Sequence, residues 1–495
     1  MTSTGKNQQS SAAAIGGRMK LARNAFYSGV SSLADVFLLL LLVLAGRFLG
    51  AEQFGAFAYA LSVTTLLTYL TNLGLDSLLI RHIAIDNNKA DYAIGTILTW
   101  KLLITAVVTA VYLVIIIYVT RDETILELIF ILMPASLLRS FNLTYRACFQ
   151  GFEKFGIESV VVLAERLILF CVGFATLWST HSAIYFAWTF FFTRAIMSVI
   201  YVVALRSRIC RFRLALDLPF AKAFQIEAFP LGIAILIFGV YSQVDILMLG
   251  IYASSPNIGL FGSAQKIYEG CLVIAFVIGS TVYPRLSKLY ATDPNRHKDL
   301  TARYFKYLTL VSAPLAATGL LFSGPIIRIF FGASFLPASE ALSFLLIAAA
   351  FYFIVAGCYT IFRSMGLQRM VMRLGLSGLI VKVILNMILI PIYGIEGAAI
   401  SAIIATIEIL MGAVYVLHQN SYYVRDVFDA TPKIVIALLA GMLATWVLSG
   451  FSIQIQIAAF GTIYVSAVFI MHTLDRYEIE LLRNIFSTIL RGRST

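Results

Sequence analysis

Residues 25–57, AFYSGVSSLADVFLLLLLVLAGRFLGAEQFGAF, hold an apolar run with one acid, Asp35, and end in a turn that contains Gly50 and Gly55. An α-helix rises about 1.5 Å per residue, so about 20 apolar residues cross the hydrocarbon of a bilayer. The run from Ala25 to Gly46 meets this length and exceeds the apolar core of a cleavable signal peptide. It predicts a first membrane helix, and similar runs recur along the chain.

The composition is typical of a chain surrounded by lipid. Of its 495 residues, 60% are hydrophobic and 13% are charged, whereas a soluble chain has about 25% charged residues. The net charge of +12 does not indicate nucleic-acid binding, because the cations stand in short clusters between apolar runs.

The sequence contains no motif for catalysis or metal binding. Its five cysteines form no CxxC pair, its five histidines form no HxxxH pair, and no GxxxxGK[ST] phosphate-binding loop occurs. We therefore expect no enzyme activity, no metal and no cofactor. A chain without this loop is not expected to hydrolyse nucleotides itself.

The apolar runs predict an all-α membrane protein with about fourteen transmembrane helices. They lie near residues 24–49, 57–77, 93–119, 125–149, 157–179, 183–205, 224–250, 258–284, 305–327, 338–362, 371–391, 396–418, 432–450 and 455–474. Lysine and arginine gather in alternate loops, and the opposite turns hold only Arg47, Arg121 and Arg328. Positively charged loops stay in the cytoplasm, so both termini are expected to be cytoplasmic.

The turn after the first helix recurs in the second half of the chain. Phe54-Gly55-Ala56-Phe57 matches Ile258-Gly259-Leu260-Phe261 at an offset of 204 residues. Each helix thus matches the one six helices later, and an even number of helices makes the two repeats parallel.

This repeat predicts the division of the chain. We expect a cytoplasmic tail at 1–23, a six-helix bundle at 24–205, a basic cytoplasmic linker at 206–223, a second six-helix bundle at 224–418, helices 13 and 14 within 432–474, and a cytoplasmic tail at 475–495. No Asp, Glu, Lys or Arg occurs between Lys433 and Asp475. Helices 13 and 14 are therefore expected to be peripheral to the transport core.

Ionisable residues inside the predicted helices are the strongest functional signal. They are Asp35, Glu165, Arg166, Arg194, Lys382 and Glu408 near mid-helix, and Arg139, Glu227, Asp245, Lys266 and Glu269 at intermediate depth. Each would cost about 2.5–3.5 kcal/mol at a lipid-facing helix centre. We therefore expect them to face a polar interior.

Polar residues at helical spacing support such an interior. The longest stripes are Ser136, Arg139, Asn142, Arg146 and Gln150, and then Thr64, Thr68, Asn72 and Asp76. Stripes on both halves predict a water-accessible cavity between two bundles. The alternative for each charge is a buried ion pair that holds helices together, as between Lys266 and Glu269, three residues apart.

Several short motifs occur in an order that resembles the Wzx-type lipid-linked oligosaccharide flippases of the MOP (multidrug/oligosaccharidyl-lipid/polysaccharide) superfamily. They are Arg47-Phe-Leu-Gly50 with Phe54-Gly-Ala-Phe57, Leu73-Gly-Leu-Asp76, Asp245-Ile-Leu-Met-Leu-Gly250 before Ile258-Gly-Leu-Phe261, Lys382-Val-Ile-Leu-Asn386, and Pro391-Ile-Tyr-Gly-Ile-Glu-Gly397. The resemblance covers nearly the whole chain. It implies a V-shaped transporter with a central cationic cavity between two bundles.

The resemblance also implies a function. Such a protein would move undecaprenyl-diphosphate-linked oligosaccharide repeat units from the cytoplasmic to the periplasmic leaflet of the bacterial inner membrane, for O-antigen, capsule or exopolysaccharide assembly. Its partners would be this substrate, H⁺ or Na⁺, and the polymerase and glycosyltransferases of the pathway, and one chain would be the transport unit. The interior acids slightly outnumber the interior bases here, which departs from a simply cationic cavity.

The candidate site residues follow from these charges. The expected substrate-binding cations are Arg139, Arg146, Arg166, Arg194, Lys266, Arg363 and Lys382. Arginine binds phosphate oxygens through two parallel hydrogen bonds and lysine binds them as a point charge. The expected ion-coupling acids are Asp35, Asp245, Glu269 and Glu408. The alternative for Asp35 is a permanent ion pair with a cation such as Arg166 or Lys382.

Three other functions are considered. A lipid II flippase and a MATE-like cation-coupled drug exporter belong to the same superfamily, but the exporter would be expected to have few intramembrane Arg or Lys. A membrane glycan polymerase or ligase generally needs a sizeable periplasmic loop, and every predicted outward turn is short.

Overall fold

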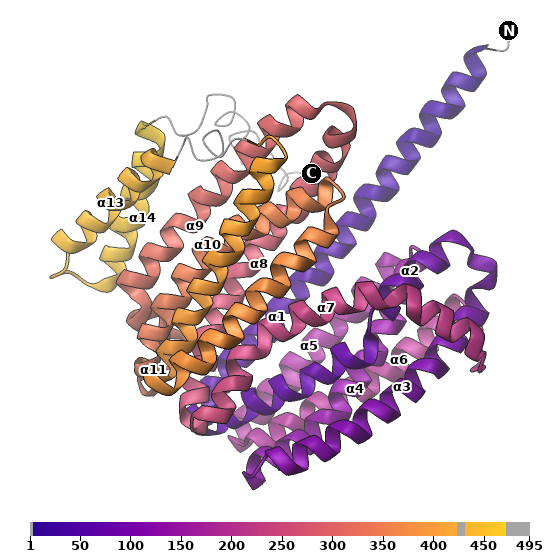
Figure 1. Ribbon diagram of the computed structural model, residues 1–495, viewed down its shortest axis with the longest axis horizontal. Coiled ribbons are helices and arrows are strands. Elements are labelled where there is room, and N and C mark those ends of the chain that lie inside the picture. Colours follow the sequence, from indigo (N-terminus) through magenta and orange to yellow (C-terminus); the bar gives the residue numbers. More distant parts are fainter. Residues whose placement is uncertain (1–2, 423–430, 472–495) are drawn as a thin grey trace. The chain divides into compact units, whose positions relative to one another are not determined.

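The computed structural model describes residues 3–422 and 431–471, and their side chains from Ala34 onward except at 88 and 208. This part of the chain contains no strand (Figure 1). Its helices are α1 (Ser3–Asn72), α2 (Leu75–Ile85), α3 (Ala90–Val119), α4 (Glu123–Gly151), α5 (Phe155–Thr180), α6 (Ala183–Arg208), α7 (Leu218–Tyr252), α8 (Ser255–Thr292), α9 (Pro294–Phe330), α10 (Ser339–Ser364), α11 (Gln368–Gln419), α13 (Thr431–Val447) and α14 (Ile453–Ile470), with 3₁₀ turns η1 (Asn87–Lys89) and η2 (Ala333–Ala338).

Two of the long helices each contain two membrane helices joined at a glycine. α1 breaks at Gly50 (φ 74°) and α11 breaks at Gly394 (φ 61°), which are backbone conformations that glycine adopts without steric cost. Eleven of the described helices are long and apolar enough to cross a membrane, and Thr431–Val447 is a shorter apolar helix. Because two of the eleven are double, they hold thirteen such segments, and the shorter apolar helix brings the number of apolar segments in the described part to fourteen. The predicted all-α membrane fold is confirmed.

The chain forms two compact units. The first unit comprises Met1–Lys266, Phe330–Pro337 and Leu385–Ile395, and the second comprises Ile267–Ile329, Ala338–Ile384 and Glu396–Thr495. The boundaries fall within α8, at the end of α9, within η2 and within α11, and the division into bundles at 24–205 and 224–418 stays a prediction. The six-helix repeat itself stays a prediction.

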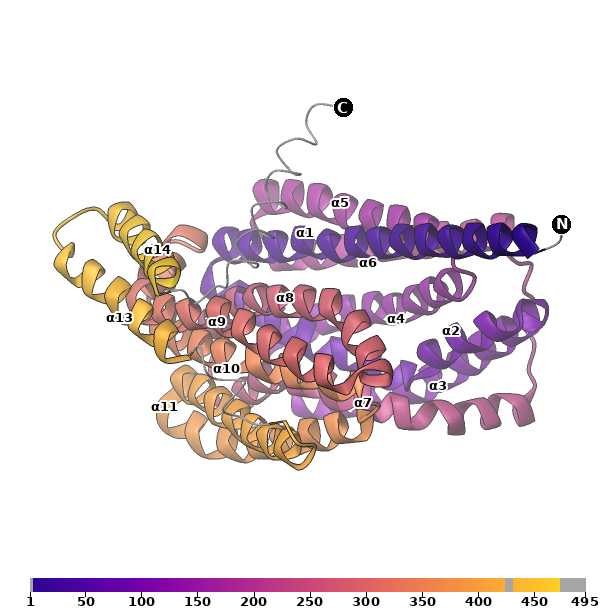
Figure 2. The ribbon, with the colours of Figure 1, turned by 90° about the horizontal axis from the view of Figure 1, so that it is seen from above.

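In the first unit, α1, α4, α5 and α6 pack on one another, and Figure 2 shows α5 and α6 alongside α1. The whole of α7 also belongs to this unit, and its N-terminal part is anchored on α3. The hydroxyl of Tyr92 donates to Asp217, which caps α7 and whose pKa this bond lowers. Trp100 Nε1 donates to Gln225 Oε1 at 3.3 Å.

Two close glycine contacts bring α7 and α8 against α1 and α2. A Cβ on Gly74 would lie 2.3 Å from the carbonyl oxygen of Ala228, and one on Gly232 would lie 2.2 Å from the carbonyl carbon of Leu73. Similarly, a Cβ on Gly55 or Gly259 would lie within 2 Å of a backbone oxygen: 1.8 Å from Ser255 and 1.9 Å from Ala51, respectively. Only glycine permits these approaches.

In the second unit, α13 and α14 pack side by side and lie against α9 (Figure 1). Ile434, Ala437, Tyr464 and Val468 form a small core with Leu310 and Ala313 of α9. The hydroxyl of Tyr464 donates to the Leu310 carbonyl at 2.8 Å.

Candidate functional site

Arg166 lies at the centre of a charged network in the first unit. Its Nε donates to Asp35 Oδ1 at 2.9 Å, and its Nη1 lies 3.5 Å from Glu165 Oε1. The Arg166 side chain is 8% exposed, whereas that of Asp35 is 60% exposed. Tyr201 of α6 donates to the second oxygen of Glu165 at 3.3 Å. Asp35 is therefore an exposed carboxylate bound to a buried guanidinium, and it has the partner that the ion-pair alternative named.

Two further arginines lie near Arg166, and no described carboxylate pairs with either of them. Arg194 of α6 is buried and interacts electrostatically with Arg139 of α4 as well as with Arg166 and Glu165. Its guanidinium packs over the Phe190 ring at 5.3 Å, and its Nη1 has no hydrogen-bond partner. Among the described residues, neither Arg139 nor Arg194 forms an ion pair. We call Arg139, Arg166 and Arg194 the arginine cluster; it places three cations beside the two carboxylates of Asp35 and Glu165.

Arg146 is arranged differently from the arginine cluster. Its Nη2 and Nε lie 2.8 and 2.9 Å from Glu158 Oε1, and Gln150 donates to the same oxygen at 3.3 Å. Glu158 is buried. This predicted site residue is therefore part of a bond between α4 and α5, although it lies on the same stripe as Arg139.

Asp245 lies elsewhere in the first unit, on α7. It is buried, and its Oδ1 accepts a hydrogen bond from Asn386 Nδ2 at 2.9 Å. Asn386 is also fully buried. The Lys382-to-Asn386 motif thus brings an amide to the carboxylate of the Asp245-to-Gly250 motif. Lys266 is half-buried at the end of the part of α8 that belongs to this unit.

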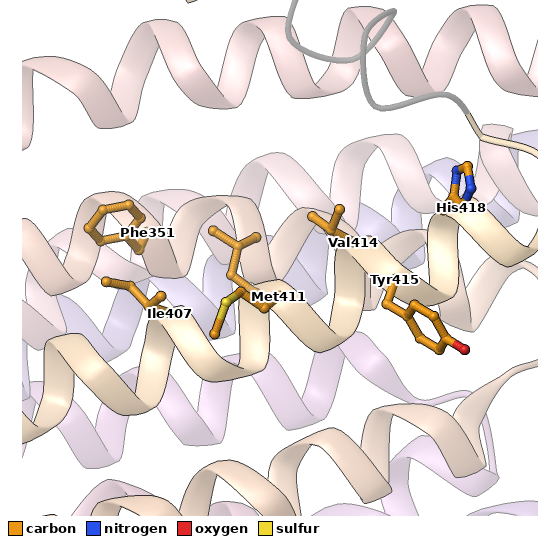
Figure 3. Close-up of a pocket in the computed structure, with 7 residues that line it drawn as sticks. Phe351, Ile407, Met411, Val414, Tyr415 and His418 are labelled. Carbon is orange, nitrogen blue, oxygen red and sulfur yellow. The ribbon is translucent and has the colours of Figure 1, made fainter.

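The second unit holds the other predicted residues. Lys382 is buried, Glu269 and Glu408 are half-buried, and Arg363 is exposed in the last turn of α10. Glu408 Oε2 is buried without a hydrogen-bond partner. A groove of about 590 Å³ lies between α10 and the second half of α11 and is lined by Phe351, Ile407, Leu410, Met411, Val414, Tyr415 and His418 (Figure 3). None of the predicted site residues lines it.

Sequence reasoning missed the most completely buried cation of the first unit. Lys101 of α3 is 0% exposed, and its Nζ lies 3.6 Å from Asp76 Oδ1. It also donates to the Ser140 carbonyl at 2.9 Å and to Thr144 Oγ1 at 2.7 Å. Asp76 ends the predicted stripe on the second helix, and that was the one signal in the sequence that pointed to this pair.

Comparison with known proteins identifies the family. A family model described as "Polysaccharide biosynthesis protein" matches residues 21–290, which is more than half of the chain. The chain belongs to the polysaccharide biosynthesis protein family. A second model, MatE, matches residues 230–388 of this family member.

Individual relatives agree with this family. The "Putative O-antigen transporter" of Shigella dysenteriae is 24% identical over 375 residues, which cover 74% of this chain and 91% of the relative. The "Probable low-salt glycan biosynthesis flippase Agl15" of Haloferax volcanii is 21% identical over 232 residues, which cover 46% of this chain and 48% of the relative.

A solved structure has the same fold. The lipid II flippase MurJ, in an inward closed conformation, superposes with a TM-score of 0.74 at 15% identity, over 90% of this chain and 99% of that chain. The resemblance to Wzx-type flippases of the MOP superfamily is thereby confirmed, and this polysaccharide biosynthesis protein is a multi-pass membrane protein.

Proposed function

We propose that this polysaccharide biosynthesis protein is a flippase that moves undecaprenyl-diphosphate-linked oligosaccharides from the cytoplasmic to the periplasmic leaflet of a bacterial inner membrane. The names of its relatives support a role in glycan transport. The observation that carries the proposal is the arginine cluster, with its three cations beside two carboxylates.

The arginine cluster has the chemistry that a diphosphate requires. A buried cation without a counter-ion is costly unless an anion approaches it. Arg139 and Arg194 have no carboxylate partner among the described residues, and Arg194 keeps an unsatisfied Nη1. A diphosphate would supply both charge and acceptor oxygens, through charge-assisted hydrogen bonds that arginine can make in parallel pairs. Arg139, which is half-buried, would meet the head group first.

Asp35 couples ion binding to the binding of the diphosphate by the arginine cluster. It holds Arg166 at 2.9 Å while most of its own side chain is exposed. A proton or Na⁺ at Asp35 would weaken its bond to Arg166 and release that guanidinium toward the diphosphate. The reverse step would return Arg166 to Asp35 and favour release of the glycan. Coupling through Asp245, Glu269 or Glu408 is a second route, and the bond from Asn386 favours Asp245 among these three.

Two related functions are alternatives. A lipid II flippase also carries a polyprenyl diphosphate, so the arginine cluster would serve it equally, and the names of the sequence relatives favour O-antigen-type glycans instead. A MATE-like exporter of organic cations is less consistent with three neighbouring arginines, because a cationic substrate would be repelled by them.

The test is transport by arginine variants reconstituted in vesicles. The probe is a fluorescent polyprenyl diphosphate that carries one N-acetylglucosamine. We expect Arg139→Ala to lower its flipping rate by about 10- to 100-fold, the cost of losing one or two charge-assisted hydrogen bonds.

The matched control is Arg328→Ala, because Arg328 is exposed in the last turn of α9 and lies outside the arginine cluster. The control should flip the probe at the wild-type rate. If Arg139→Ala, Arg166→Ala and Arg194→Ala all keep the wild-type rate while inserted in the membrane, the arginine cluster is not the head-group site.

A further inference from the structure

We propose that Asp76 and Lys101 form a second proton-binding site in the first unit, which controls how α7 packs against the break between α1 and α2. The two residues lie outside the arginine cluster and outside the predicted ion-coupling set. The inference adds a coupling site to the proposed function and rests on it for its role in transport.

The pair is surrounded by polar groups from α1 and α4. Lys101 is fully buried and the side chain of Asp76 is 14% exposed, and Nζ lies 3.6 Å from Oδ1. Thr144 donates to the same Asp76 oxygen at 2.7 Å, and Asn72 donates to the other oxygen. Every acceptor around Lys101 is thus an oxygen of α2 or α4. Ionisable residues at membrane depth are rare and mark functional sites or proton pathways.

Asp76 stands directly beside a break in the chain. Leu73 and Gly74 have φ angles of 40° and 85°, and α2 begins at Leu75. The backbone NH of Asp76 donates to Asn72 Oδ1 at 3.3 Å, so Asn72 and Asp76 bind each other across the break. A change in the charge of Asp76 therefore acts at the residues that set the direction of α2.

The break is also the contact surface of α7. Gly232 packs against Leu73 and Gly74 at a distance that excludes any side chain. Gln225 of α7 donates to the Leu73 carbonyl at 3.4 Å and accepts from Trp100 at 3.3 Å. Gln225 therefore connects two positions in the chain. One is Leu73, three residues before Asp76, and the other is Trp100, the residue before Lys101 on α3.

The other ionisable groups near the pair are accounted for. Cys148 of α4 is buried and interacts electrostatically with both Asp76 and Lys101. Arg81 of α2 pairs with Glu227 of α7 at 3.4 Å on the exposed surface. His82 contacts the rings of Phe220 and Phe224. Proton uptake by Asp76 would leave Lys101 without its counter-ion, and we expect the Leu73–Gly232 contact to loosen in response.

Trp100 fluorescence in the purified full chain tests this proposal without any substrate. The other three tryptophans, Trp178, Trp188 and Trp446, are exposed and are replaced by Phe. We expect the emission to change when the pH of the medium is varied, and Asp76→Asn to abolish that titration. Glu227→Gln, which breaks the exposed Arg81 pair between the same helices, should leave it unchanged.

Asp76→Asn leaves the buried Lys101 without its counter-ion and could prevent folding. A second variant keeps the test decisive in that case. The double variant Asp76→Asn/Lys101→Met removes both charges, and its emission should be flat over the same pH range. A titration that survives in either variant, or that is absent from the wild type, overturns the proposal. The result of this titration does not affect the flipping assay of Arg139→Ala. Failure of the Asp76–Lys101 proposal can therefore be distinguished from failure of the proposed function.

Discussion

At the scale of single residues, Asp35 and Arg166 have opposite environments. Asp35 exposes 60% of its side chain while the side chain of Arg166 exposes 8%. An ion can therefore reach the carboxylate without first displacing the packing around the guanidinium. In the proposed mechanism, Asp35 would bind the ion and Arg166 would respond toward the substrate.

Asp35→Asn should uncouple transport from the ion gradient. The amide keeps the size of the side chain but cannot bind a proton or Na⁺ as a carboxylate does, so Arg166 no longer competes with the ion. We expect flipping of the N-acetylglucosamine diphosphate probe by Asp35→Asn to be insensitive to an imposed pH or Na⁺ gradient.

Glu123→Gln is the matched control, since Glu123 is exposed at the start of α4, and it should respond to the gradient as the wild type does. Acceleration of Asp35→Asn by the gradient to the wild-type extent would remove Asp35 from the coupling mechanism.

The sequence indicated the charges of the first unit but not all of their partners. Helical spacing placed Arg139 and Arg146 on one stripe, yet Arg146 binds Glu158 while Arg139 forms no ion pair with any described residue. Spacing within one helix cannot distinguish them, because the difference comes from α5. Lys101 was missed for a related reason: its oxygen partners include a backbone carbonyl at Ser140, which no side-chain pattern reveals.

At the scale of elements, glycine decides where helices meet. The repeated motif predicted equivalent turns around Gly55 and Gly259, and the structure brings these two positions into backbone contact. Contact between equivalent residues is what an axis relating two parallel repeats would produce. The breaks at Gly50 and Gly394 were also predictable, because a single apolar helix as long as α11 would exceed the bilayer more than twofold. The docking of α7 on α3 was not predictable from the sequence, since it depends on contacts between segments that are distant along the chain.

Gly259→Ala should destabilise the first unit. Its Cβ would lie 1.9 Å from the Ala51 carbonyl oxygen, and backbone on both sides cannot yield as a flexible side chain would. We expect a cost of about 1–3 kcal/mol, as for overpacking in a core, seen as a lower thermal unfolding temperature in detergent.

Gly461→Ala is the control, because nothing lies within 4 Å of a Cβ at that position of α14, and alanine is the better helix former. It should unfold at the wild-type temperature or slightly above it. Equal unfolding temperatures for Gly259→Ala and Gly461→Ala would show that the glycine contact does not limit stability.

At the scale of the whole molecule, the boundary between units cuts through α8 and α11. The division at the basic linker 206–223, which the sequence repeat indicates, stays a prediction. The arginine cluster, the Asp76–Lys101 pair and Asp245 with Asn386 all belong to the first unit. The charge chemistry that we assign to substrate and ion binding is therefore concentrated in one compact body.

Flipping of a lipid-linked sugar by the purified wild-type chain tests the central claim most directly. Vesicles contain a fluorescent polyprenyl diphosphate with one N-acetylglucosamine, and a membrane-impermeant quencher reports the fraction in the outer leaflet. We predict that vesicles with the chain expose inner-leaflet probe faster than protein-free vesicles, and that excess unlabelled glycolipid slows this exposure. The contradicting result is a probe that stays in its leaflet while the same vesicles take up a lipophilic fluorescent cation, because that would identify a drug exporter.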